Sequence, residues 1–233
     1  LAQPFLKLAG QRVNPQIHAR QRITEYTACT VQWFSEGKNI AIALPAVGRL
    51  AGVPSWSPDG KRLAFGVDVA DGVQLWVADA HTGKSKRIGN LLLNDVLATA
   101  FYWLEDSERL LVRSIPPGRG PAPSATVVPT VPSIEETAGK VSKVMNYQDL
   151  LKNEHDELLF EYYATSQLLI AGATSGKLQL LGTPGLYTQV NWSPDQQHVL
   201  VTQLRKPFSY RVQFSNFARK TEVWDRNGKS LRT

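Results

Sequence analysis

The residues that could carry hydrolytic chemistry do not form a recognisable catalytic set in this sequence. A serine nucleophile on a strand-to-helix turn needs the pattern Gly-x-Ser-x-Gly, because small flanking residues allow the strained turn. The nearest match is Gly172-Ala173-Thr174-Ser175-Gly176, which has threonine at the central position. The histidines are not paired in sequence with a serine or a carboxylate, and we expect exposed side chains at His18, His81, His155 and His198. We therefore predict no catalytic residue in this chain.

Metal and cofactor chemistry finds equally little support. Cys29 is the only cysteine, so the sequence holds no internal disulfide and no cysteine-based zinc site. No cluster of histidine, aspartate and glutamate has ligand spacing, and the acidic runs at 135–136 and 154–157 are typical of solvated faces. We predict neither a metal nor a cofactor.

Two short basic segments remain as candidates for binding. One flanks a proline-rich stretch, and the other brackets a Pro-Phe-Ser-Tyr run. Ammonium and guanidinium groups are natural partners of a carboxylate, and the tyrosine adds an aromatic surface. The candidate residues are Arg113, Arg119, Lys206, Tyr210 and Arg211. The alternative interpretation is structural: Phe208 and the tyrosine pack between sheets, while the lysine is solvated.

A repeated turn shows which elements must position these residues. Trp56-Ser57-Pro58-Asp59-Gly60 returns as Trp192-Ser193-Pro194-Asp195-Gln196 and, in degenerate form, at 103–107, each time followed by a short apolar run. The tryptophans are 47 and 89 positions apart, close to one and two steps of a single period. A period in the forties with short strands is the signature of a β-propeller blade. We expect Trp56, Trp103 and Trp192 to pack in the core.

The hairpins between these repeats predict an all-β fold, a partial β-propeller of about three to four four-stranded antiparallel blades. We assign the whole chain, 1–233, to one propeller segment. The predicted parts are a blade tail at 31–44, a blade at 50–90, a blade at 98–181 with an insertion at 114–165, and a blade at 187–233. Since a ring that begins inside a blade leaves open edges, we expect a piece of a larger propeller, or completion by a partner chain.

The insertion differs from the blades in composition. It begins with four prolines between Ser114 and Pro123, which indicates an extended, polyproline-like loop. From Asn146 to Tyr163 the pattern predicts a helix, with Asn146 as N-cap and an apolar stripe that includes Leu151 and Leu158. An ordered insertion of this length in a compact repeat fold is more often functional than idle.

Length, charge and hydropathy restrict the partners. The chain has 233 residues, 42% of them hydrophobic, which is enough for a core. Its net charge of +6 is scattered, so we predict no nucleic-acid partner. The absence of a long apolar run predicts no membrane partner. We expect a processed or cut product, because the chain starts at Leu1 and no signal peptide is visible. One free cysteine leaves the cytoplasm and a periplasmic or secreted location equally open.

Several idiosyncratic runs carry a family resemblance. Tyr147-Gln148-Asp149-Leu150-Leu151-Lys152-Asn153, the following residues 156–167, Lys206 to Tyr210 and Glu222 to Lys229 resemble the propeller domain of the prolyl oligopeptidase family of serine peptidases, in its glutamyl endopeptidase branch. The resemblance covers nearly the whole chain, most firmly from 53 to 233. The chain departs from the branch at Lys206, where an arginine is expected, and at Gln196, which replaces the turn glycine.

The resemblance implies that this chain is a non-catalytic propeller portion that caps the active site of a separate α/β-hydrolase domain, absent from this chain. It also implies a restriction of substrates to peptides, and cleavage after glutamate. A glutamate side chain needs a cationic partner, which makes the five basic and aromatic candidates substrate-binding residues. The alternative hypothesis is an independent propeller-type module that binds a protein partner or associates with itself through open blade edges.

Overall fold

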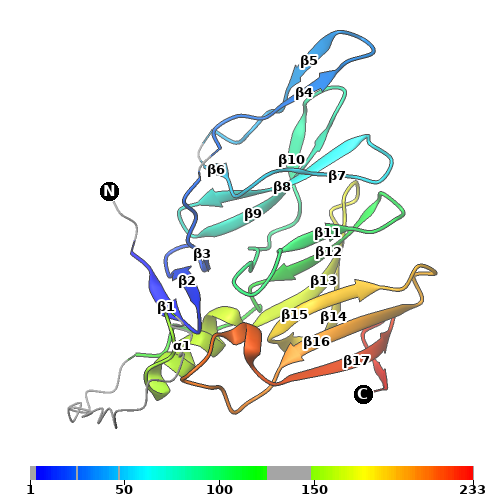
Figure 1. Ribbon diagram of the computed structural model, residues 1–233. Helices are drawn as coiled ribbons and strands as arrows, with labels where there is room; N and C mark the ends of the chain where they lie inside the picture. Colours follow the sequence, from blue (N-terminus) through cyan, green and yellow to red (C-terminus); the bar gives the residue numbers. More distant parts are fainter. Residues whose placement is uncertain (1–3, 25, 47, 125–147, 233) are drawn as a thin grey trace, which may run out of the picture.

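The computed structural model describes residues 4–24, 26–46, 48–124 and 148–232, which form five antiparallel sheets and one α-helix (Figure 1). Three larger sheets follow one another along the chain, and we name them blades 1, 2 and 3. The strands of blade 1 are β6 (Arg49–Leu50), β7 (Ser55–Trp56), β8 (Arg62–Val69), β9 (Gly72–Asp79) and β10 (Ser85–Arg87). They lie in the order β10-β9-β8-β6, and β7 pairs with the other end of β8.

Blades 2 and 3 are four-stranded meanders. The strands of blade 2 are β11 (Phe101–Trp103), β12 (Arg109–Ser114), β13 (Ser166–Gly172) and β14 (Leu178–Gly185). The strands of blade 3 are β15 (Tyr187–Trp192), β16 (His198–Leu204), β17 (Arg219–Asp225) and β18 (Ser230–Arg232). In each of these two blades the strands pair in sequence order, so β11 and β15 are edge strands.

Two smaller sheets lie at the N-terminal end of the chain. The first is β1 (Leu6–Leu8), β2 (Gln11–Asn14) and β3 (Ala19–Arg20), and the second is the hairpin of β4 (Thr30–Trp33) and β5 (Lys38–Ala41). The hairpin is one edge of the fan of sheets, while the first sheet lies beside the helix (Figure 1). The turn that connects β4 to β5 contains Glu36 and Gly37.

The hydrophobic cores lie between neighbouring sheets. Val31 and Ile42 pack with Leu63 and Phe65, between the β4–β5 hairpin and blade 1. A second core joins blade 1 to blade 2, and a third joins blade 2 to blade 3 around Trp224. Sheets that bury both faces against their neighbours are the architecture of a propeller, so the predicted all-β partial β-propeller is confirmed.

The repeated turn has the same conformation in its three copies. Gly60, Ser107 and Gln196 occupy the same place in the repeat, and their φ angles are 68°, 59° and 54°. Each of these residues donates its backbone N–H to the carbonyl oxygen three positions earlier, at 2.8–3.1 Å. The repeat therefore imposes a left-handed position even where glycine is missing, at the conformational cost that L-residues meet there.

The tryptophans of the repeat are less buried than predicted. Trp56 is 46% exposed, and Trp103 and Trp192 are half-buried. Each stands at the end of an edge strand. The Trp56 ring meets Trp33 of the β4–β5 hairpin edge-on at 6.2 Å, whereas Trp103 and Trp192 pack against the cores on the two sides of blade 2. The prediction of core packing is wrong for Trp56.

The helix of the insertion is shorter than the sequence pattern predicts. Helix α1 spans Glu154–Ala164, and Asn153 caps it by accepting a hydrogen bond from the Asp156 backbone at 2.9 Å. Asp149 has a φ of 59°, a left-handed conformation that a right-handed helix does not contain. Leu151 is buried outside the helix, and Leu158 is half exposed, so the expected stripe is also wrong. Asn146 lies outside the described residues.

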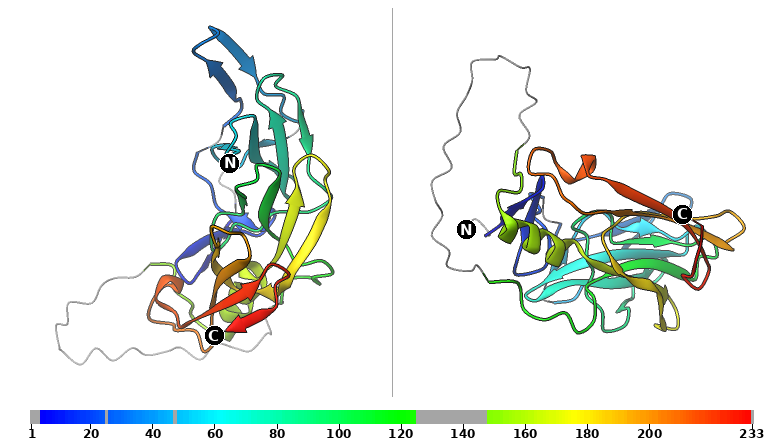
Figure 2. Two further views of the ribbon diagram at one scale, coloured as in Figure 1. Left: turned by 90° about the vertical axis from the view of Figure 1, so that its right-hand side faces the viewer. Right: turned by 90° about the horizontal axis from the view of Figure 1, so that it is seen from below.

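A separate layer surrounds α1, and we call it the α1 layer. It joins the β1–β2 hairpin, the loop at 96–97, the helix and the connection from β16 to β17, which contains a short 3₁₀-helix, η1 (Phe214–Asn216). Phe160 of the helix is its centre, with ring contacts to Phe208 at 5.3 Å and to Phe217 at 5.9 Å. The right-hand view in Figure 2, seen from below, shows α1 beside the β1–β2 hairpin at one side of the blades.

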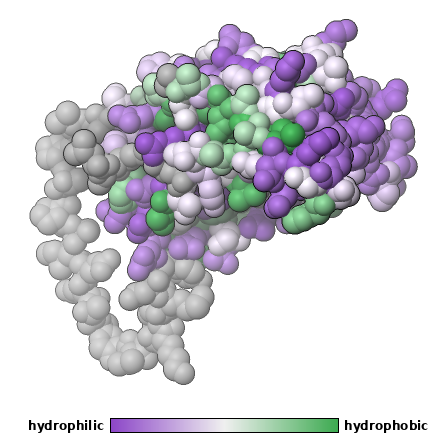
Figure 3. Space-filling model, turned by 90° about the horizontal axis from the view of Figure 1, so that it is seen from above, coloured by the Kyte–Doolittle hydropathy of each residue, from purple (hydrophilic) through white to green (hydrophobic). Residues whose placement is uncertain are grey.

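The face beyond the β4–β5 hairpin is apolar in part. Figure 3 shows hydrophobic side chains gathered over the middle of this view, with hydrophilic ones around them. Ile23, Phe34 and Val53 are among the large hydrophobic residues that stay exposed. Among the described residues, the structure contains no helix with the length and apolar character to cross a membrane.

Candidate functional site

Helix α1 is the element that the two predicted basic segments approach. Three acidic residues stand in its first turn, where they complement the positive end of the helix dipole. Its inner face is buried at Leu159, Phe160 and Tyr163, so the outer face is fixed in place. Side chains that contact this face are therefore held by a rigid element.

Lys206 and Tyr210 bind the acidic side of α1. The ammonium of Lys206 lies 2.6 Å from a carboxylate oxygen of Glu161 and 3.9 Å from one of Glu157. The hydroxyl of Tyr210 donates to Glu157 at 3.1 Å. The pKa of Tyr210 is raised, mainly by burial and in addition by the neighbouring Glu157 carboxylate. Lys206 is thus paired, and the prediction that Glu157 belongs to a merely solvated acidic run is wrong.

Arg119 approaches α1 from the proline-rich side. Its guanidinium lies over the ring of Tyr162 at 4.1 Å and donates to the Tyr162 carbonyl oxygen at 2.6 Å. It also lies 2.6 Å from Nδ1 of His18. Because arginine can only donate, this nitrogen of His18 accepts and carries no proton. Burial, and then the charge of Arg119, lower the pKa of His18. The expectation of an exposed His18 is wrong.

Arg113 is separated from this group. It is a strand residue of β12, is 2% exposed, and donates through Nη1 to the Thr99 carbonyl oxygen at 2.6 Å. Its guanidinium lies 5.5 Å from the centre of the Tyr102 ring. The Nε and Nη2 atoms have no partner among the described residues. Burial lowers the pKa of Arg113, opposed by Tyr102.

Arg211 completes the predicted set. Its side chain is exposed, and its backbone N–H donates to the Ser209 hydroxyl at 3.1 Å. The structure therefore brings Arg119, Lys206 and Tyr210 to one helix, while Arg113 lies inside blade 2. The alternative interpretation expects Phe208 to pack between the blade sheets. This is wrong, because the Phe208 ring packs in the α1 layer.

Ionic contacts that the sequence analysis missed attach the N-terminal segment. Arg22 bridges Asp68 of blade 1 at 3.0 Å and Asp95 at 2.5 Å. Arg12 contacts Asp149 at 2.9 Å, and bonds from Arg12 and Lys7 hold the pKa of Asp149 below its usual value although burial opposes this. These pairs join residues 46 to 137 positions apart. No local pattern marks such pairs, since charges scattered over an unassigned segment are ordinarily solvated.

The α1 layer offers hydrogen bonds and charges but no metal geometry. Within the part of the chain that the structure describes, no group of three His, Cys, Asp or Glu residues is placed to hold a metal ion. The cations that approach α1 are occupied by its carboxylates and carbonyl groups. The arrangement therefore locks an insertion onto the blades and presents a mixed polar surface.

Comparisons with known proteins agree with this architecture. No family model matches the chain. It is 36% identical over 247 aligned positions to a probable chloroplastic glutamyl endopeptidase of Arabidopsis thaliana and 33% identical to one of Oryza sativa subsp. japonica. The alignments cover 100% of this chain but only 25% and 26% of these relatives, so the chain spans about a quarter of their length.

Among solved structures, the acylaminoacyl peptidase of Pyrococcus horikoshii aligns with 88% of this chain and 27% of its own. The TM-score is 0.50 and the sequence identity is 15%. At this identity the likeness concerns the fold.

Proposed function

From the relationship of this chain, over its full length, to the glutamyl endopeptidase branch of the prolyl oligopeptidase family, we propose that it is the non-catalytic propeller portion of a serine peptidase. The observation that carries the proposal is the 36% identity to the Arabidopsis thaliana relative. The alignment covers the whole of this chain and a quarter of that longer protein. In this role the blades cap the active site of an α/β-hydrolase domain and restrict its substrates to peptides. The nucleophile belongs to that domain, consistent with a sequence that lacks Gly-x-Ser-x-Gly.

The α1 layer supplies the fixed rim of such a cap. A cap excludes folded proteins only if its rim does not give way, and Arg119 and Lys206 hold α1 from two sides. The contacts also rank the proposed substrate-binding residues. Arg211 is exposed, whereas Lys206 already binds Glu161, so a substrate carboxylate would have to compete with Glu161 at Lys206. Arg119 and Tyr210 are likewise engaged with α1, and Arg113 is enclosed.

The proposal is tested on a polypeptide that carries this chain joined to a hydrolase domain of the same family. Cleavage after glutamate is measured on a short peptide and on a folded protein that contains the same sequence. We expect the double variant R119Q and K206Q to raise the ratio of folded-protein to peptide cleavage by about tenfold, because a loosened rim admits larger substrates. The variant Q179A, at an exposed position of β14, is the matched control.

An unchanged ratio in the double variant, with α1 shown to be released by hydrogen exchange, would argue against a capping role. The apolar patch in Figure 3 favours a second candidate, an independent protein-binding module. Sedimentation of the chain separates the two. A monomer that binds the isolated hydrolase domain supports the cap, and a self-associated form that ignores this domain supports the module.

A further inference from the structure

The contact between blades 1 and 2 defines what a closed junction of this repeat looks like. The indole of Trp103 donates to the Ser55 carbonyl oxygen of blade 1 at 3.0 Å. The repeated turns also meet, because the Asp59 backbone donates to the Ser107 hydroxyl and Arg62 donates to the Ser107 carbonyl oxygen, both at 2.9 Å. These three direct hydrogen bonds are among those that close this junction.

The junction between blades 2 and 3 repeats one part of this pattern and lacks another. Arg109, which occupies the place of Arg62, donates to the Gln196 side chain at 2.9 Å. Trp192 occupies the place of Trp103, but its Nε1 has no partner among the described residues and is shielded from solvent. An unpaired buried donor is destabilising, so this junction is left incomplete.

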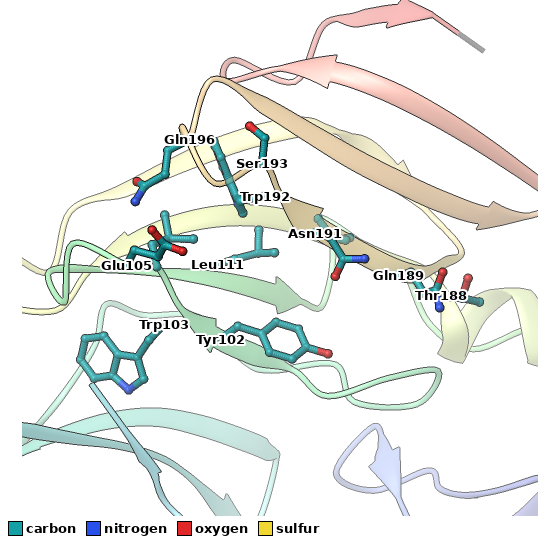
Figure 4. A pocket seen from close by; sticks show the side chains of 12 residues that line it. Tyr102, Trp103, Glu105, Leu111, Thr188, Gln189, Asn191, Trp192, Ser193 and Gln196 are labelled. Carbon is teal, nitrogen blue, oxygen red and sulfur yellow. The ribbon is translucent and has the colours of Figure 1, made fainter. Parts of the chain in front are cut away.

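A cleft of about 480 Å³ lies at this incomplete junction (Figure 4). Tyr102 and Leu111 of blade 2 form one wall, and Gln189, Asn191 and Trp192 of β15 form the other. Gln189 and Asn191 are two residues apart on one strand, so their side chains leave the same face, and both are exposed. Figure 4 shows the Asn191 amide and the Tyr102 ring directed into the cleft from opposite sides.

These groups match the chemistry of a peptide main chain. A primary amide offers a donor and an acceptor side by side, so it can bind both the N–H and the C=O of a peptide group. The cleft also lies between β11 and β15. In the described sheets these are edge strands, and the outer side of an edge strand can pair with an added strand. The aromatic wall suits small side chains without requiring a charge.

We propose that the cleft between blades 2 and 3 binds the main chain of an extended peptide through Gln189 and Asn191. This inference concerns binding by the chain itself and does not depend on the capping role, since a peptide can bind here whether or not a hydrolase domain is present.

The test uses the ¹⁵N-labelled chain and a blocked hexapeptide, acetyl-(Ala-Thr-Ser)₂-amide. The expected result is a shift of the Gln189 and Asn191 side-chain amide signals, which are assigned with Q189A and N191A. The variants Q189A and N191A should each weaken binding about fivefold, and the double variant at least tenfold, since each loses one pair of hydrogen bonds. Q179A, an exposed glutamine on β14, should bind as the wild type does.

Matched ligands separate main-chain binding from other binding. A peptide N-methylated at each residue lacks the amide donors and should bind at least tenfold more weakly. Any of four results would overturn the proposal: no shift at about 5 mM peptide, equal affinity for the methylated peptide, unchanged affinity of the double variant, or preferential binding of maltohexaose, which would make the cleft a carbohydrate site.

Discussion

The blades and the α1 layer are held together in different ways. Within each blade, strands pair with neighbours along the chain, and each core joins two adjacent sheets. The α1 layer instead joins segments that are remote in sequence, as in the contacts of His18 with Arg119 and of Glu161 with Lys206. In a repeat protein each unit contacts only its neighbours, so a lost contact disturbs the structure locally. A layer built from segments remote in sequence depends on all of these segments staying in place.

The largest expected effect comes from removing the centre of the α1 layer. Phe160 is 0% exposed and contacts two other phenylalanines, so F160A should lower the free energy of unfolding by about 3–5 kcal/mol. Hydrogen exchange should accelerate in α1, the β1–β2 hairpin and residues 205–217 before it accelerates in β15 and β16. The blade counterpart is L168A, also at 0% exposure, with an expected loss of about 2–5 kcal/mol.

L168A should accelerate exchange in blades 2 and 3 together, because Leu168 belongs to the core between them. If hydrogen exchange accelerates in different sets of residues in the two variants, the blades and the α1 layer are held together independently. This distinction fails if F160A releases the blades and the α1 layer in one transition, since the layer would then be part of a single cooperative unit.

The difference between local repeats and remote contacts explains why the sequence predicts the blades better than the α1 layer. A turn that recurs at one period specifies the blades, because its tryptophan, aspartate and left-handed residue recur with it. The helix was placed too early, since Asn153 and Asn146 are equivalent as caps by residue type and only the left-handed Asp149 decides between them. Substrate binding by Arg119, Lys206 and Tyr210 stays a prediction. The sequence does not predict their partners in the α1 layer, because no local pattern relates Glu161 to a lysine 45 positions away.

An intermediate effect concerns acid sensitivity of the α1 layer. Burial lowers the pKa of His18 below its ordinary value of 6.5, so the folded state favours the neutral ring. The associated stability is present above pH 6.5 and is lost as the pH falls through the lowered pKa of the folded state. H18Q keeps an acceptor for Arg119 without a titrating group. It should therefore lose less stability than the wild type between pH 7.5 and 5.5, by about 1 kcal/mol or less because His18 is half exposed.

Thermal unfolding at the two pH values measures this difference, and other groups that titrate in both proteins cancel from it. If H18Q and the wild type lose equal stability on acidification, the contact between His18 and Arg119 does not close the layer.

The smallest expected effect concerns the outer ion pair. K206Q removes the charge that binds Glu161 and Glu157, and both partners are partly solvated, so the free energy of unfolding should fall by only about 0.2–1 kcal/mol. The effect should shrink in about 1 M salt, because salt screens exposed pairs. R211Q, an exposed position five residues further along the same connection, is the matched control and should stay within about 0.5 kcal/mol of the wild type. If both variants lose the same free energy of unfolding, independently of salt, the ion pair does not hold this connection. The stacked rings of Phe208 and Phe217 would then attach it to the α1 layer.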